Sequence, residues 1–229
     1  MLNEVKYINN LSNDELFDLI FEVVGLNKLV NQEHADILMS YLTDNPAPLR
    51  EASAYKIEEM IASSPEFFKT ELAKQKFLDA ISDINPNISR IICDIIKNND
   101  FVSGMLIDDI IERVSAIITK IQNYQEENSD FFQNKIKNKK NHVKNKLLFS
   151  LYWYLEALSN CNITEYEEKI LKILNYTIDF CDYTIREKTA KLLTKFANPP
   201  YEILQKAKSD QNFYVKIQVH DKIKVEDLN

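Results

Sequence analysis

Two stretches of the sequence decide the fold. They are Asp44-Asn-Pro-Ala-Pro-Leu49-Arg50-Glu51-Ala52-Ser53-Ala54-Tyr55-Lys56-Ile57 and Asp182-Tyr183-Thr184-Ile185-Arg186-Glu187-Lys188-Thr189-Ala190-Lys191-Leu192-Leu193. In each, turn-forming residues precede an apolar residue, an arginine and a run with apolar positions at helical spacing. Weaker copies begin at residues 83, 142 and 210. The apolar position falls at residues 49, 88, 143, 185 and 215, in steps of 39, 55, 42 and 30 residues, so the sequence predicts repeated helix pairs of about 40 residues.

The ends of the expected helices carry recognisable signals. Ser12 and Glu15 form a capping box that predicts a helix to about Val24, with Gly25 as its left-handed terminator. Similar pairs at Thr164/Glu167 and Thr184/Glu187 predict two more helix starts. In all, the apolar periodicity and the turn residues predict helices over about 12–24, 31–43, 48–62, 65–82, 88–97, 103–123, 142–159, 164–180, 184–196, 200–208 and 213–225.

The composition excludes several classes of protein. The chain of 229 residues has only two glycines, where about 7% would give roughly 16. Dinucleotide-binding fingerprints, P-loops and nucleophile elbows all require more glycine, and β-hairpin turns are scarce for the same reason. With 45% hydrophobic and 28% charged residues, the chain is typical of a folded globular protein. We expect one domain, residues 1–229, with a polar Lys-rich insertion at about 124–141.

The sequence also predicts where the protein resides. Its three cysteines form no paired motif, and the first residues lack the basic and apolar parts of a secretory signal. No apolar run approaches the length of a membrane span, which takes about 18 residues. We therefore expect a cytoplasmic protein that does not associate with membranes.

The repeated stretches resemble the HEAT repeat, whose second helix begins D-x-x-x-x-V-R-x-x-A-x-x-x-L. The copies at 44–57 and 182–193 match best, whereas Ser89 or a lysine replaces the arginine in the other copies. The resemblance implies an all-α fold, a right-handed α-solenoid of about five antiparallel helix pairs similar to HEAT and armadillo folds. It also implies that the arginine hydrogen-bonds to its own turn or to an aspartate of the neighbouring repeat.

Such a scaffold binds partners through the second helices of its pairs. If their charges are free, Arg50, Arg90, Arg186 and Lys216 are candidate partner-binding residues. The densest aromatic cluster adds Tyr152, Trp153 and Tyr154, because part of it fills the core and any ring left exposed is a candidate hot spot.

A lysine-rich segment provides candidate anion-binding residues: Lys135, Lys137, Lys139, Lys140 and Lys144. It has no arginine and no interleaved aromatic residue, so we do not expect nucleic acid as the partner. A solvated insertion, an acidic partner protein and the acidic part of the chain itself remain open interpretations.

No catalytic or metal-binding set stands out. His34, His142 and His220 lie in different repeats, and no metal-ligand spacing occurs. Asp108, Asp109 and Glu112 share a helix face and can hold a metal or share a proton, but a solvated face beside Arg113 is the simpler interpretation. We predict no enzyme activity, no cofactor and no metal.

The charge is unevenly distributed, with −12 over residues 1–130 and +5 over residues 131–229. Our leading hypothesis is a non-enzymatic module that binds a protein partner. One alternative is an enzyme on the same scaffold, such as a DNA alkyl-base glycosylase or a phycobilin lyase. Another is an immunity-type inhibitor whose acidic N-terminal region covers a basic toxin. The identity of the partner and the oligomeric state stay open.

Overall fold

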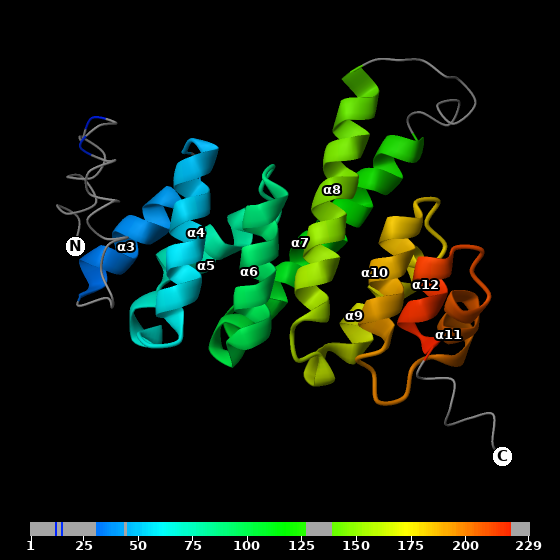
Figure 1. Cartoon of the computed structure of the whole chain (residues 1–229). Helices are drawn as coiled ribbons and strands as arrows, with labels where there is room; N and C mark the ends of the chain where they lie inside the picture. The colour runs from blue at the N-terminus through cyan, green and yellow to red at the C-terminus, as the bar shows by residue number, and fades with distance from the viewer. Residues whose placement is uncertain (1–11, 13–14, 16–30, 44, 127–138, 221–229) are drawn as a thin grey trace. The chain divides into compact units, whose positions relative to one another are not determined.

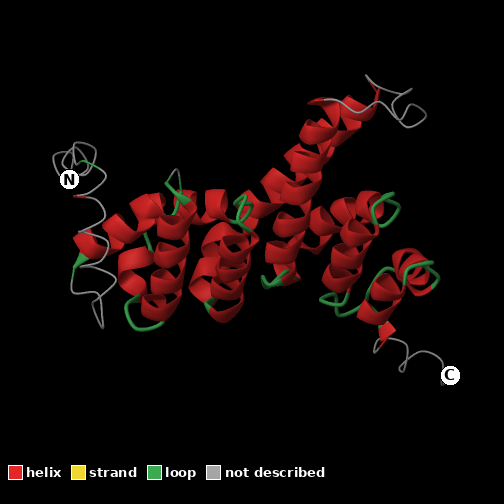
Figure 2. Ribbon diagram, turned by 45° about the horizontal axis from the view of Figure 1, so that its top comes forward, coloured by secondary structure: helices red, strands yellow, loops and turns green. Residues whose placement is uncertain are grey.

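The structure is all-α. The computed structural model describes residues 12, 15, 31–43, 45–126 and 139–220 (Figure 1). Within these ranges every regular element is helical and there is no strand (Figure 2). The elements are α3 (Gln32–Tyr41), α4 (Ala47–Ile61), η1 (Pro65–Phe68), α5 (Glu71–Ala80), α6 (Pro86–Asn98), α7 (Asp100–Glu126), α8 (Lys139–Ser159), η3 (Thr164–Tyr166), α9 (Glu167–Thr177), α10 (Tyr183–Leu193), α11 (Tyr201–Lys208) and α12 (Phe213–Gln218). The predicted all-α class, an α-solenoid of paired helices, is confirmed.

Short polar side chains begin many of these helices. Asn31, Thr70, Asn85, Asp182 and Asn212 each accept a hydrogen bond from a backbone N–H of the first turn. The capping box near the N-terminus is present as well, because the Ser12 N–H donates to Glu15 Oε2 at 2.8 Å and the Glu15 N–H donates to Ser12 Oγ at 3.4 Å. The rest of the helix predicted over 12–24, including Gly25, lies outside the described residues.

Two predicted helices are each interrupted near their start. Residues 65–82 form η1 and α5 as separate elements, because the extended backbone of Thr70 ends the first and its side chain caps the second at 3.1 Å from Ala73 N. Residues 164–180 likewise form η3 and α9. The capping boxes predicted at Thr164 and Thr184 are wrong.

The reason is the same at both threonines. Asn162 and Asp182, two residues earlier, accept both the backbone N–H and the hydroxyl proton of the threonine. A short Asn or Asp side chain makes this local turn readily, so the threonine hydroxyl is used as a donor and does not cap the helix.

The two longest helices extend beyond their predicted ends. The helix predicted over 103–123 spans Asp100–Glu126, and the helix predicted over 142–159 begins at Lys139. The expected connection at 124–141 is therefore helical at both edges, and residues 127–138 lie outside the described part. Gln, Glu and Lys have high helix propensity, which explains why these polar edges continue the helices.

The chain divides into two compact units, Met1–Met105 and Leu106–Asn229, with the boundary inside α7. In the first unit, α4 contacts α3 and α6, and α5 contacts α3 and α6, so α3 and α5 form one layer and α4 and α6 the other. The core between the layers includes the isoleucines of α6 and the rings of Phe68 and Phe77, which are fully buried. The organisation as one domain stays a prediction.

In the second unit, α10 is the central element. It packs against α8 on one side and α12 on the other, and it also contacts α9 and α11. The second helices of successive pairs thus lie side by side in the order α8, α10, α12 (Figure 1). None of the described helices is both long and apolar enough to span a bilayer.

Candidate functional site

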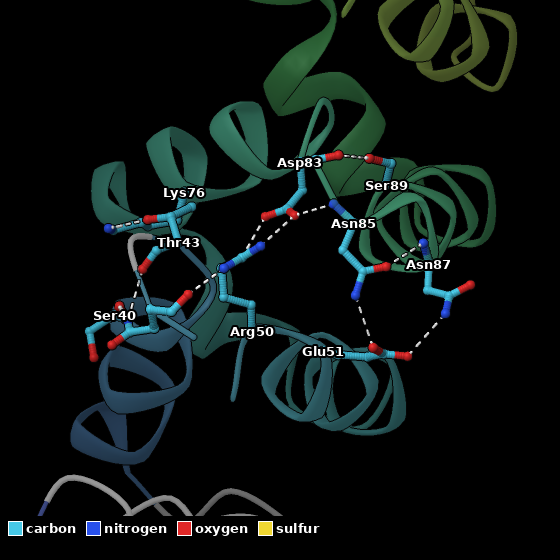
Figure 3. Close-up of polar contacts among 10 residues, drawn as sticks. Ser40, Thr43, Arg50, Glu51, Lys76, Asp83, Asn85, Asn87 and Ser89 are labelled. Atoms are coloured by element: carbon cyan, nitrogen blue, oxygen red, sulfur yellow. Dashed lines mark hydrogen bonds and ion pairs between the residues drawn. The ribbon is translucent and has the colours of Figure 1, made fainter. Parts of the chain in front are cut away.

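Arg50 joins two repeats of the first unit (Figure 3). Its Nε and Nη2 atoms donate to the two carboxylate oxygens of Asp83 at 2.7 and 2.8 Å, and its Nη1 donates to the carbonyl of Asn45 in its own turn. Asp83 also accepts from the backbone N–H of Asn85 at 2.7 Å. The guanidinium is thus held between the turn of its own repeat and the turn of the next.

Arg186 makes the equivalent contact in the second unit. We call this contact between an arginine and the turn aspartate of the next repeat the arginine joint. Arg186 donates to Asp210 at 2.6 and 3.1 Å and to the carbonyls of Phe180 and Cys181 at 2.7 and 3.1 Å. Asp210 accepts from the N–H of Asn212 at 2.7 Å, as Asp83 does from Asn85. The hydrogen bonds from Arg186 outweigh partial burial and hold the pKa of Asp210 below its usual value.

These contacts confirm the role that the motif predicts for its arginine. Arg50 and Arg186 form ion pairs inside the chain, so the condition that their charges be free for a partner is not met. In the copy that begins at Asp83, buried Ser89 replaces the arginine and donates to the Asp83 carbonyl at 3.1 Å. Arg90, one residue later, pairs instead with Asp94 at 3.4 Å on an exposed face of α6.

The aromatic cluster of α8 divides between core and surface. Tyr154 is buried, and its hydroxyl accepts from Arg113 at 3.0 Å, which identifies it as a core residue. Tyr152 and Trp153 are half-buried and pack edge to face, with ring centroids 5.2 Å apart. Their part in partner binding stays a prediction.

Tyr152 belongs to a charged cluster between α8 and α10. The Lys188 ammonium lies 4.6 Å from the centroid of its ring and 2.9 Å from Glu156 Oε2, and Lys191 donates to Glu156 Oε1 at 2.5 Å. Burial alone would raise the pKa of Glu156, but the hydrogen bond from Lys191 and the charge of Lys188 lower it overall. The cluster therefore holds two lysines beside one carboxylate, with Lys188 also over the Tyr152 ring.

Lys144 and Lys216, two other predicted basic residues, lie apart from this cluster. Lys216 is exposed on α12, near Asp210, and the backbones of Lys139 and Lys140 begin α8. Lys144 is half-buried in α8. Lys135 and Lys137 lie outside the described residues, so the anion-binding hypothesis stays a prediction.

The sequence analysis did not single out the exposed aromatic side chains at the starts of α10 and α12. Tyr183 at the start of α10 is 42% exposed, and Phe213, Tyr214 and Ile217 of α12 are 63%, 58% and 48% exposed. The Tyr183 and Tyr214 rings stack with centroids 6.4 Å apart, and Phe213 packs edge to face on Tyr214 at 5.8 Å. We call these four residues the α10–α12 patch. No local signal in the sequence could have found them, because the rings of Tyr183 and Tyr214 stack only where α10 and α12 pack side by side.

A polar contact lies next to this patch. Glu187 follows Tyr183 by four residues and Gln218 follows Tyr214 by four, so each lies one turn further along its helix. Gln218 Nε2 donates to Glu187 Oε1 at 3.5 Å, and Lys188 Nζ lies 4.0 Å from the same oxygen. The surface of α10 and α12 thus presents stacked rings beside a carboxylate whose contacts with described residues are long, at 3.5 and 4.0 Å.

The acidic group of α7 forms ordinary surface pairs. Asp108 accepts from the Tyr166 hydroxyl and from Lys169, both at 3.0 Å, and these side chains are exposed. Within the described part of the chain, no group of three or more His, Cys, Asp or Glu residues is placed to hold a metal ion.

Comparison with known proteins adds a weak structural likeness. No family model and no curated protein matches the sequence. A designed armadillo repeat protein in complex with the peptide (KR)4 aligns over 96% of this chain and 97% of its own, at 13% identity and a TM-score of 0.47. Another designed armadillo repeat protein aligns over 95% of this chain and 96% of its own, at 14% identity and a TM-score of 0.46. These values are too low to support an argument about function.

Proposed function

We propose that this chain is a non-enzymatic protein-interaction module, a HEAT-like solenoid that binds a partner protein on the layer formed by α8, α10 and α12. The observation that supports the proposal is the α10–α12 patch. Exposed large apolar side chains that contact one another typically mark a binding surface, whereas single exposed ones are common on any protein. Tyrosine and phenylalanine also provide large contact areas at low entropic cost, which makes them frequent hot spots.

The structural roles of the other candidates strengthen this choice. Arg50 and Arg186 join repeats, and Tyr154 fills the core. The rings of the α10–α12 patch have no such role, because much of their surface faces solvent.

The test is affinity capture from the native host, followed by measurement of the binary affinity for the captured protein. We expect Tyr183→Ala combined with Tyr214→Ala to weaken that affinity at least tenfold, the cost of losing one or two hot-spot rings of about 1–2 kcal/mol each. Tyr55→Ala is the matched control, because Tyr55 is 47% exposed on α4 in the first unit. Equal affinities for the control and the double variant would reject this surface.

A further inference from the structure

We propose that Tyr183, Tyr214 and Glu187 form a subsite for an arginine side chain in an exposed segment of the partner protein. This inference rests on the proposed function and names the chemistry of the group that the α10–α12 patch recognises. It is supported by a comparison of two equivalent glutamates, by an internal example of the same chemistry and by the charge of the chain.

The two units contain equivalent glutamates whose carboxylates accept different numbers of hydrogen bonds. Glu51 and Glu187 each directly follow the arginine that joins two repeats. Glu51 accepts from the side-chain amides of Asn85 and Asn87 at 3.0 and 3.2 Å (Figure 3). Among the described residues, Glu187 accepts only the 3.5 Å contact from Gln218. Tyr214 occupies the position equivalent to Asn87, and Asn212, at the position equivalent to Asn85, makes no such contact. At the position of Tyr214 the second unit thus has an aromatic ring where the first unit has an amide donor.

The nearest described cation, Lys188, does not fill this gap. Lys188 lies 4.0 Å from Glu187 but 2.9 Å from Glu156, and its ammonium lies over the Tyr152 ring. Lys216 follows Tyr214 by two residues and so projects from a different face of α12. The Glu187 carboxylate therefore retains capacity to accept hydrogen bonds from an external donor.

The chain itself shows which ligand suits an aromatic face beside a carboxylate. Between α8 and α10, the cation Lys188 occupies such a place, with Tyr152 beneath it and Glu156 beside it. The subsite has the same two components, but its nearest described ammonium, that of Lys188, lies 4.0 Å from the carboxylate, against 2.9 Å in that example. Arginine fits better than lysine there, because its planar guanidinium stacks on tyrosine while its N–H groups reach a carboxylate.

The net charge of the whole chain, −7, favours a cationic ligand at long range and raises its association rate. Residues 106–229, which contain the subsite, hold 19 Lys and Arg against 18 Asp and Glu, a net charge of +1. The preference for arginine therefore comes from the short-range contacts with Glu187 and the two rings.

The experiment is a heteronuclear NMR titration of the isotope-labelled full chain with a peptide of repeated Gly-Ser-Arg units. The control peptide replaces each arginine by citrulline, which has nearly the same shape and no charge. We expect chemical-shift changes confined to residues 183–187 and 213–218 with the arginine peptide, and at least threefold weaker binding of the citrulline peptide. Glu187→Gln should weaken the arginine peptide by about three- to fivefold, whereas the matched control Glu51→Gln should not change it.

Several outcomes would overturn the subsite. They are equal binding of both peptides, shift changes spread over other acidic surfaces, or an unchanged affinity in Glu187→Gln. Loss of the captured partner in the tyrosine double variant without any of the expected peptide effects would leave the proposed function standing and reject only the arginine subsite. Localised arginine binding with an unchanged partner affinity in the tyrosine variant would instead reject the proposed function at this surface.

Discussion

Removal of the Arg186 charge should lower the free energy of unfolding far more than removal of the Arg90 charge does. The side chains of Arg186 and Asp210 are only 18% and 8% exposed, and two hydrogen bonds join them. Arg186→Met keeps most of the apolar stem but leaves the Asp210 carboxylate without its cation. Breaking a fully buried pair costs roughly 3–5 kcal/mol, and the residual exposure here reduces the expected loss to about 2–3 kcal/mol.

The matched control is Arg90→Met, which makes the same chemical change in an exposed pair. Arg90 and Asp94 are 55% and 39% exposed and lie 3.4 Å apart, so this loss should stay within about 0.5 kcal/mol. Urea unfolding followed by far-UV circular dichroism gives both free energies. Hydrogen exchange then assigns the change to α10 and α12.

A second substitution separates the effect of the orphaned charge from a packing defect. Adding Asp210→Asn to Arg186→Met should restore part of the lost stability, because the unpaired carboxylate is removed. Equal losses for Arg186→Met and Arg90→Met would refute the view that the arginine joint stabilises the repeat interface. A double variant less stable than Arg186→Met would show that the orphaned charge is not the source of the loss.

Three further predictions follow from the same contacts. The pKa of Asp210 is held below its usual value of about 3.9. The contribution of its carboxylate to stability is therefore complete above about pH 3.9 and is lost as the pH falls through the lower pKa of the folded state. The difference in unfolding free energy between wild type and Asp210→Asn should accordingly shrink in acid. Glu156→Gln should lower stability by about 1–2 kcal/mol in thermal unfolding at neutral pH, because two neighbouring lysines lose their shared carboxylate, and an unchanged Tm would contradict this. Asp182→Ala should cost about 1 kcal/mol and Thr184→Ala clearly less, since Asp182 caps α10; the reverse order in urea unfolding would favour the capping box expected from the sequence.

The sequence was a good guide at several positions where local chemistry decides the structure, although it misplaced the caps near Thr164 and Thr184. The helix start at residue 31, the Ser12/Glu15 capping box and the reach of Arg50 and Arg186 into a turn all depend on residues whose spacing is visible in the chain. The break at Thr70 was missed because the apolar pattern continues across it, and only the backbone conformation shows that a new helix begins there.

The candidate site was less predictable because exposure depends on what the neighbouring repeat provides. Tyr154 and Trp153 are adjacent in sequence, yet one is buried and the other half-buried. Tyr183 and Tyr214 lie about one repeat apart and stack only because α10 and α12 pack side by side. No local pattern distinguishes such rings from core aromatics.

The arginine joint has a consequence for how the chain can change its length. The donor of each joint belongs to one repeat, and the carboxylate belongs to the turn that opens the next. Duplication of a repeat that contains both the arginine and the turn aspartate supplies one new donor and one new acceptor, so the new copy can make the same contact with its neighbour. A truncation at the turn leaves either the arginine or the aspartate at the new end without its partner. Stable truncations should therefore end beyond a turn aspartate, and insertions that persist through evolution should add complete repeats.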